Sequence, residues 1–367
     1  MGRIVVAGHV CLDIIPDFGK AVKPLMEIFV PGTLTEIGRA TVATGGAVSN
    51  TGIALHRLGL DVSLMAKVGD DEFGHSILNI LAQYGEGPVS GMIMDPAVES
   101  SYSIVINPPG IDRVFLHCPG ANHTFCAEDI EYEKLEGVDL FHFGYPTLMR
   151  SMYRDAGAEM KEIFERVRGK GVLTSLDMTR PDPAAESGKV DWLAWLRNVL
   201  PKVDIFLPSI DEILYMLNRP KYEALAAEFG EDNLMAGIDC ATVREVAQRL
   251  LDLGVSVVVI KLGDQGLYLR TADGVPGRGP VWSNADIFAP CYQAAVVGTT
   301  GSGDCTIAGF LAGFVKGGTP QDAMNSAVGV GACSTESAEA TGAVPHWDEV
   351  QRRITAGWGR LASKFID

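Results

Sequence analysis

A glycine-rich turn in the last quarter of the chain is the segment best suited to chemistry. Residues 297–304 read Val-Gly-Thr-Thr-Gly-Ser-Gly-Asp and lie between a short apolar run and a predicted helix. Backbone N–H groups at the start of a helix can bind an anion, because glycines let the anion approach closely. A carboxylate would repel a phosphate, so Asp304 fits this turn if it faces a hydroxyl that must lose its proton. The turn therefore predicts phosphoryl transfer from a nucleotide to an alcohol.

The residues after Asp304 predict the helix that must position this turn. Four large apolar residues recur at helical spacing, which is typical of a buried stripe: Ile307, Phe310, Leu311 and Phe314. A second face carries small residues that would let a neighbouring element pack closely: Ala308, Gly309, Ala312 and Gly313. An alternative interpretation gives Asp304 no chemistry and makes it the N-cap of a core helix, a position that aspartate favours.

The other elements alternate between strands and helices, which predicts a parallel sheet covered on both faces. Apolar strands are predicted near residues 3–8, 61–68, 140–143, 172–177, 205–207 and 255–262. Ligands of such sheets bind outside the carboxyl ends of the strands. Six residues follow predicted strands and are expected along that rim: Asp13, Gly144, Asp177, Ser209, Gly263 and Gly301.

Two extended segments, residues 14–44 and 100–118, do not fit this alternation. They predict a small separate sheet that flanks the rim as a lid, with a hairpin turn at residues 108–112. Residues 219–241 and 273–292 have weak patterns, and we interpret them as surface insertions on a single domain that spans residues 1–367.

Composition excludes several other classes of function. The chain has 367 residues, 47% of them hydrophobic, and a formal net charge of −16. This charge argues against nucleic acid or an anionic membrane as a partner. No apolar run reaches the length of a transmembrane helix, and the first residues read as a buried strand rather than a signal peptide. Seven scattered cysteines predict a reducing, cytoplasmic location.

Several familiar motifs are missing from the sequence. It contains neither the P-loop pattern nor the glycine pattern of dinucleotide-binding folds. One cluster of metal-ligating residue types does not have a zinc spacing, so we interpret its members as polar strand and loop residues: His117, Cys118, His123 and Cys126.

A second motif lies near the amino terminus. Gly45-Gly46-Ala-Val-Ser-Asn50 is followed by Leu58-Gly59 and by Lys67-Val-Gly-Asp-Asp-Glu-Phe-Gly74. Combined with the turn at residues 298–304, it resembles the ribokinase family, the phosphofructokinase-B type of carbohydrate kinases. The resemblance covers nearly the whole chain. It implies an α/β fold, a ribokinase-like three-layer sandwich with a mostly parallel central sheet and a small β-lid.

The resemblance also implies roles for individual residues. Asp304 matches the catalytic base of the family, which takes the proton from the acceptor hydroxyl. The anion hole for the transferring phosphoryl group would be Gly301, Ser302 and Gly303. The acceptor-binding set would be Asp13, Gly45, Gly46 and Asn50. The ATP-binding set would be Ser209, Glu212, Gly263, Gly266, Thr300 and Asn325, with Glu212 acting indirectly on Mg²⁺.

This chain departs from the family pattern at some positions. Gly298 stands where members usually carry an aspartate that helps to bind a monovalent cation, so activation by potassium stays open. Ser209 stands in place of an asparagine, and Ala47 in place of the lysine that ribose-specific members often have.

Simpler interpretations of the same residues also stay open. Gly45 and Gly46 could form only a turn, with Asn50 as a helix cap. Glu212 could be a first-turn carboxylate that the helix dipole favours.

We therefore expect an ATP- and Mg²⁺-dependent kinase that phosphorylates a primary hydroxyl of a sugar or sugar derivative. The alternatives are a nucleoside kinase of the same fold, or a regulator that binds a sugar or nucleotide without turnover. We also expect a homodimer through the lid, because a small exposed sheet has edges to cover.

Overall fold

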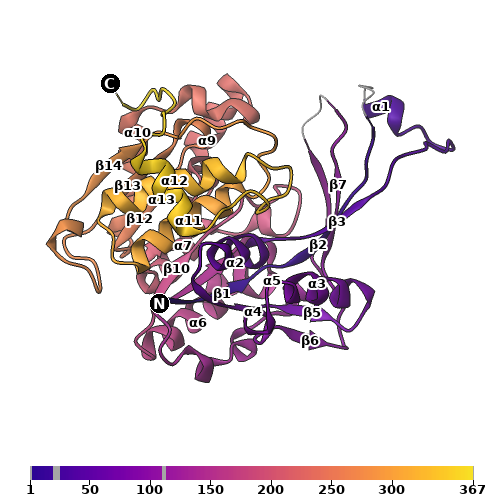
Figure 1. Ribbon diagram of the computed structural model, residues 1–367, viewed down its shortest axis with the longest axis horizontal. Coiled ribbons are helices and arrows are strands. Elements are labelled where there is room, and N and C mark those ends of the chain that lie inside the picture. The colour runs from indigo at the N-terminus through magenta and orange to yellow at the C-terminus, as the bar shows by residue number, and fades with distance from the viewer. Residues whose placement is uncertain (1, 20–24, 110–112, 367) are drawn as a thin grey trace.

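The computed structural model describes residues 2–19, 25–109 and 113–366. Its centre is an eight-stranded sheet in the order β14-β13-β12-β11-β10-β9-β1-β4 (Figure 1). The strands are β1 (Arg3–Gly8), β4 (Asp61–Met65), β9 (Leu140–Gly144), β10 (Leu173–Leu176), β11 (Ile205–Phe206), β12 (Val257–Lys261), β13 (Leu267–Thr271) and β14 (Asp286–Ala289). All neighbours from β4 to β12 are parallel, and only the pairs that involve β13 and β14 are antiparallel. The predicted mostly parallel sheet is confirmed.

The central strands are buried on both faces because they are apolar at nearly every position. Along β1, Ile4 and Val6 belong to one core, whereas Val5 and Ala7 belong to the other. The first core includes helices α2 (Ala47–Arg57), α11 (Ser302–Val315), α12 (Pro320–Ser334) and α13 (Trp347–Thr355). The second includes α6 (Ala158–Gly169), α7 (Trp192–Val199), α8 (Ile210–Leu217) and α10 (Cys240–Asp252). Two helical layers thus enclose the sheet, as the three-layer prediction required.

A second sheet of four strands projects from the main body (Figure 1). Its order is β3 (Thr41–Gly45), β2 (Cys11–Ile15), β7 (Tyr102–Ile106) and β8 (Val114–Cys118). The short helix α1 (Leu25–Ile28) lies near its far end. The predicted lid is therefore present, although its strands reach slightly beyond the expected range of 14–44. The hairpin turn expected at 108–112 lies partly outside the described residues.

The two segments interpreted as surface insertions contain regular structure. Residues 219–241 include helix α9 (Arg219–Phe229), of which Tyr222 is buried. Residues 273–292 include β14, which pairs with β13 and extends the main sheet. The interpretation of the second segment as surface alone needs correction, because β14 is a strand of the main sheet. A four-residue strand at the edge of the sheet is too short to give a recognisable sequence pattern.

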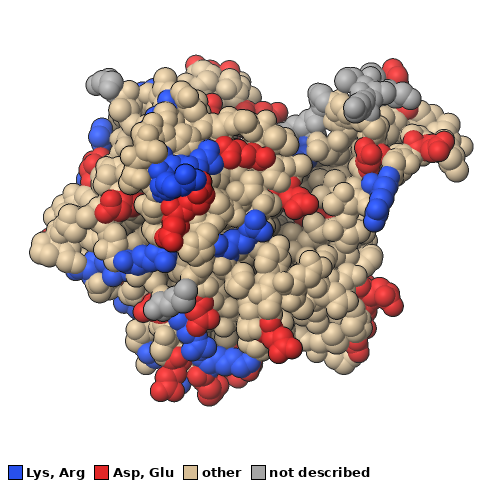
Figure 2. Space-filling model, in the orientation of Figure 1, with Lys and Arg blue, Asp and Glu red and all other residues tan. Residues whose placement is uncertain are grey.

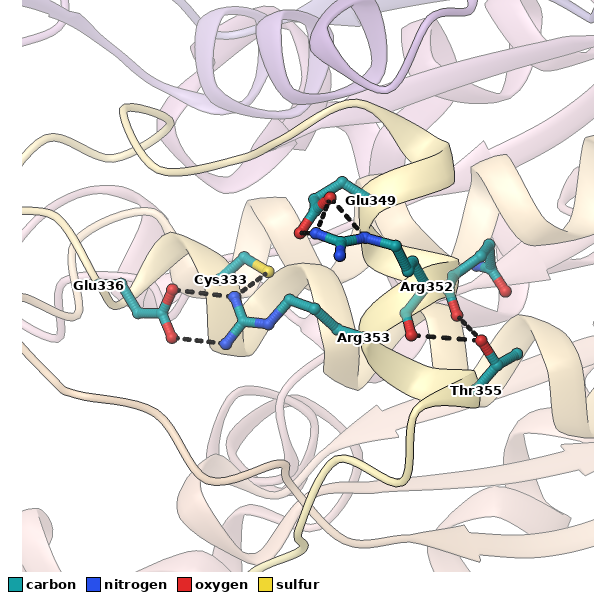
Figure 3. Close-up of polar contacts among 7 residues, drawn as sticks. Cys333, Glu336, Glu349, Arg352, Arg353 and Thr355 are labelled. Atoms are coloured by element: carbon teal, nitrogen blue, oxygen red, sulfur yellow. Dashed lines mark hydrogen bonds and ion pairs between the residues drawn. The ribbon is translucent and has the colours of Figure 1, made fainter.

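The last helix is fixed to the body by a charged pair. Arg353 of α13 donates two parallel hydrogen bonds to Glu336, at 2.9 and 2.8 Å, and a third to the Cys333 sulfur at 3.2 Å (Figure 3). Bidentate pairs of this kind fix orientation as well as distance. The pair holds α13 against α12, which in turn packs on α11, the helix of the glycine-rich turn.

Smaller elements complete the fold: α3 (Glu72–Ala82), α4 (Glu86–Val89), α5 (Arg150–Tyr153), β5 (Lys67–Gly69) and β6 (Ile93–Asp95). Basic and acidic side chains are interspersed over the face drawn in Figure 2, where a notch separates the lid from the body. Among the described residues, no helix is long and apolar enough to cross a membrane.

Candidate active site

The glycine-rich turn ends in the first turn of α11. This helix begins at Ser302, and its N-cap is Gly301, whose φ of 68° lies in the left-handed region that favours glycine. Asp304 is the third residue of the helix, so the alternative interpretation of Asp304 as the N-cap is wrong. In the described part of the chain, the N–H groups of Gly303 and Asp304 have no hydrogen-bond acceptor. Two free N–H groups at a helix start can bind an anion.

The Asp304 carboxylate is buried and held by two donors. Its side chain is 3% exposed. The Asn50 amide donates to Oδ2 at 2.9 Å, and the Tyr145 hydroxyl donates to Oδ1 at 2.7 Å. Burial raises the pKa of Asp304, while hydrogen bonds from Tyr145 and Asn50 and the charge of Lys261 oppose this rise. Asn50, which lies in the first turn of α2, therefore orients the Asp304 carboxylate and does not serve as a helix cap.

Tyr145 was not predicted as a site residue. It directly follows β9, and its φ of 61° is unusual for a residue with a side chain. Strained backbone of this kind clusters at functional sites. Here it turns the ring back toward the rim, where the hydroxyl reaches Asp304. The only signal in the sequence is the position after a predicted strand.

The expected acceptor-binding residues lie together at the root of the lid. Cys11 and Gly45 are paired across β2 and β3, and a Cβ atom added to Gly45 would lie 2.2 Å from an Asp13 carboxylate oxygen. Gly46 is the N-cap of α2 with φ of 89°, and a Cβ atom there would lie 2.5 Å from His9 Nδ1. Both positions need glycine because a side chain would collide with Asp13 or His9, so the two glycines do more than form a turn. Burial raises the pKa of Asp13.

His117 contacts two residues that lie far from it in the sequence. Its Nε2 lies 3.3 Å from Nε2 of His9, and its Nδ1 lies 3.0 Å from the Ser103 hydroxyl. Together with Cys11, these two histidines are the group of possible metal ligands that the described residues bring within 4.8 Å of one another. Burial lowers the pKa of both His9 and His117, and the two rings lie beside the root of the lid.

Ser209 and Glu212 form the amino-terminal cap of α8. Ser209 is the N-cap, and its backbone N–H donates to the Glu212 carboxylate at 2.7 Å. The position of Glu212 thus agrees with the simpler interpretation of a first-turn carboxylate, although only one of its oxygens is used in this bond. Burial and the nearby Asp211 and Asp177 raise the pKa of Glu212, while Lys261 opposes the rise.

Lys261 and Asp177 form a buried ion pair at the same rim. The Lys261 ammonium donates to Asp177 Oδ1 at 2.8 Å, and Asp177 Oδ2 has no partner among the described residues. Burial raises the pKa of Asp177, and the ammonium only partly offsets the rise. Burial alone would lower the pKa of Lys261, but the carboxylates of Asp177 and Glu212 outweigh it and raise the pKa. Lys261 was also missed, because it ends an apolar strand.

The remaining expected nucleotide residues lie on three elements. Gly263 and Gly266 form the turn between β12 and β13, and a Cβ atom on Gly266 would lie 2.1 Å from the Ala289 carbonyl oxygen. Asn325 is on α12, where its side-chain oxygen accepts from Arg360 at 2.5 Å. Thr300 precedes the N-cap of α11 and accepts a hydrogen bond from Arg113, which directly precedes β8 of the lid.

Gly298 begins the turn, and its N–H donates to the Thr335 carbonyl at 3.2 Å. A Cβ atom there would lie 3.1 Å from the Ser337 carbonyl oxygen. A backbone hydrogen bond therefore helps to hold the start of this loop.

The enclosed sheet and the projecting lid together form a fold of the ribokinase type. The structure resembles that of a fructokinase with bound ATP from Xylella fastidiosa, with a TM-score of 0.72, 19% identity and coverage of 96% of this chain and 98% of that one. The family model for pfkB family carbohydrate kinases matches residues 1–347.

The chain therefore belongs to the pfkB family of carbohydrate kinases, whose members are ATP-dependent phosphotransferases. It is 27% identical to an uncharacterized sugar kinase of Archaeoglobus fulgidus over 72% of this chain and 87% of that one. It is 24% identical to fructokinase-1 of Zea mays over 83% and 84% of the two chains.

Proposed function

We propose that this protein transfers the γ-phosphoryl group of ATP to a primary hydroxyl of a sugar or sugar derivative, with Asp304 as the general base. One observation carries the proposal: a buried carboxylate, fixed by Asn50 and Tyr145, lies beside two free N–H groups at the start of α11. In a phosphoryl transfer, the base accepts the proton of the acceptor hydroxyl and the neighbouring N–H groups bind the transferring phosphoryl group.

The residues divide the work between the two substrates. Asp304 accepts the proton of the acceptor hydroxyl, and the turn of Gly301, Ser302 and Gly303 receives the charge of the phosphoryl group. Asp13, Gly45, Gly46 and Asn50 hold the sugar, since a carboxylate and an amide suit neighbouring hydroxyls. The nucleotide is held by Ser209, Gly263, Gly266, Thr300 and Asn325.

Magnesium fits this rim. The unpartnered Oδ2 of Asp177 and the second oxygen of Glu212 are the oxygen ligands that Mg²⁺ prefers, directly or through water. When bound, the ion neutralises charge on the nucleotide phosphates. Gly298 supplies no carboxylate to a monovalent cation, so this chain lacks a side-chain ligand at that position.

Asp304→Asn tests the proposal. The amide keeps the size of the side chain but cannot accept the proton, so we expect kcat to fall about 10²- to 10⁴-fold with the fold intact. ADP release measures kcat, and circular dichroism measures whether the fold is intact. Asp252→Asn is the control, because this exposed residue ends α10 shortly before the amino-terminal end of β12, whereas the proposed site lies at the carboxyl ends of the strands. An Asp304→Asn variant that keeps more than a tenth of wild-type kcat would contradict the assignment.

A substrate panel decides between the classes of acceptor. It should contain D-fructose, D-ribose, sugar acids and nucleosides, each at millimolar concentration with ATP and Mg²⁺. We expect ADP release with a sugar or sugar acid. Release with nucleosides alone would favour a nucleoside kinase, and binding without any release would favour a non-catalytic regulator.

We also propose that the lid mediates a homodimer. Its strands expose apolar side chains, including Val42 at 50%, Phe115 at 51% and Leu116 at 55%. Val42 lies on one edge strand of the lid sheet, and the other two lie on the opposite edge strand. A second copy could cover the apolar surface and the strand edges together.

A further inference from the structure

Lys261 lies between Ser209, which is proposed to hold the nucleotide, and the start of α11, which is proposed to hold the phosphoryl group. Its backbone N–H donates to the Pro208 carbonyl at 2.9 Å, and it pairs with Ser209 as a parallel bridge. Its side chain extends in the other direction, toward α11. A Cβ atom added to Gly303 would lie 3.9 Å from Lys261 Cδ and 4.0 Å from Nζ. The ammonium is therefore beside the free N–H groups at the start of that helix.

The position of the ammonium is fixed, and its hydrogen-bonding capacity is only partly used. The side chain is 12% exposed, and Asp177, its partner at 2.8 Å, is 1% exposed. An ammonium group has three donors. Within the described part of the chain, one of the three donates, to Asp177 Oδ1. Two donors thus remain for a ligand at the rim.

A purely structural counterion does not account for this arrangement. A lysine that only neutralised the buried Asp177 carboxylate could approach either carboxylate oxygen from any side. Instead the lysine side chain extends to the start of α11, where a Cβ atom on Gly303 would be in ordinary van der Waals contact with the ammonium. A positive charge fixed next to backbone N–H donors is the arrangement that stabilises developing negative charge.

We propose that the Lys261 ammonium contacts the phosphoryl group during its transfer and is a catalytic residue of this enzyme, an inference that depends on the proposed function. In that step the acceptor oxygen bonds to the γ-phosphorus, and its proton passes to Asp304. The bond from the γ-phosphorus to the bridging oxygen breaks, and its electron pair leaves with ADP. Lys261 stays protonated and balances charge on the equatorial oxygens of the γ-phosphoryl group.

Lys261→Gln tests this role with two readouts. Removing the fixed positive charge should lower kcat about 10²- to 10³-fold and leave the KM for ATP within about threefold. Calorimetry should show an unchanged affinity for ADP, but a loss of the extra affinity that wild type has for ADP with aluminium fluoride, which imitates the transferring group. Equal affinity of wild type and variant for ADP with aluminium fluoride would overturn the proposal.

Lys67→Gln is the matched control, because Lys67 is also a buried lysine, 8% exposed and paired with Asp129 at 2.6 Å. We expect it to lower the melting temperature similarly but to keep kcat and the affinity for ADP with aluminium fluoride. If Lys67→Gln loses both as strongly, the effect of Lys261→Gln is one of stability and the proposal is wrong.

A crystal structure of wild-type enzyme with ADP and aluminium fluoride gives an answer that does not depend on any variant folding. We expect Lys261 Nζ about 3 Å from a fluoride, and an ammonium that contacts Asp177 alone would overturn its role. Failure of the proposed function is recognised separately, by wild-type enzyme that releases no ADP with any acceptor of the panel. The aluminium fluoride affinities of wild type and Lys261→Gln then decide the role of the lysine.

Discussion

At the scale of single residues, opposing effects set the pKa of Asp304, the proposed base. Burial makes the charged form of Asp304 less favourable, whereas Tyr145, Asn50 and Lys261 favour it. The net result is a raised pKa, so the carboxylate is a stronger base than an exposed aspartate. Because the base must be deprotonated, activity should be lost as the pH falls through this raised pKa.

Tyr145→Phe should move the acid limb of the pH profile of kcat/KM to higher pH. The hydroxyl stabilises the carboxylate through a 2.7 Å hydrogen bond, so its removal leaves burial less opposed and raises the pKa of Asp304 further. Initial rates between pH 4 and 9 measure the shift.

Tyr84→Phe is the control, since Tyr84 lies just after α3 and contacts the ring of His56. It should leave the acid limb where wild type has it. A Tyr145→Phe limb that stays in place, or moves to lower pH, would show that Asp304 does not control it.

The sequence was sufficient to propose Asp304, the glycine turn, Gly45, Gly46 and Asn50 as site residues, because each belongs to a run of neighbouring residues, whereas Asp13 was proposed from its position after the first strand. Tyr145 and Lys261 escaped prediction for a different reason. Their importance depends on where β9 and β12 end relative to α11, which is a property of the folded sheet. A single tyrosine or lysine after an apolar strand carries no pattern of its own.

At the scale of elements, the small-residue face of α11 explains how the turn is held. Gly309 and Gly313 face α12, and a Cβ atom on Gly309 would lie 2.6 Å from the Ser326 carbonyl oxygen. The close approach of the two helices fixes the direction of α11 and therefore the position of its N-terminus. The predicted close packing along this face is thus present.

Gly309→Ala should destabilise the protein although alanine normally favours a helix. The Cβ atom must displace the backbone of α12, which we expect to cost about 1 to 3 kcal/mol of unfolding free energy. Gly169→Ala, at the end of α6, has no atom within 4 Å of the added Cβ and should be neutral or stabilise by about 0.5 kcal/mol. Urea unfolding measures both. Equal effects of the two substitutions would contradict this account of the helix contact.

Prediction was weakest for short elements. Strand β14 covers Asp286–Ala289, and β11 only Ile205–Phe206, too few residues for a period to be recognised. β11 was still expected, because it is apolar and lies between two predicted helices. β14 begins with a charged residue at the edge of the sheet, so neither composition nor context indicated it.

At the scale of the whole molecule, the apolar lid predicts the oligomeric state. Light scattering at micromolar concentration should give twice the chain mass of 39.2 kDa. Leu116→Glu should give the single-chain mass, because a buried unpaired charge in the interface is costly. Val281→Glu, 60% exposed and on the main body, is the control and should leave the dimer intact. A wild-type monomer, or a dimer that survives Leu116→Glu, would contradict a lid interface.

The lid joins the body through very short connections. Only two residues separate β1 from β2, and Gly46 alone separates β3 from α2. Asp13 and Gly45 lie at these roots, while Asp304 belongs to the body. The proposed sugar pocket thus lies at the junction of the lid and the body and is built from residues of both, so its shape depends on the angle at which the lid leaves the body.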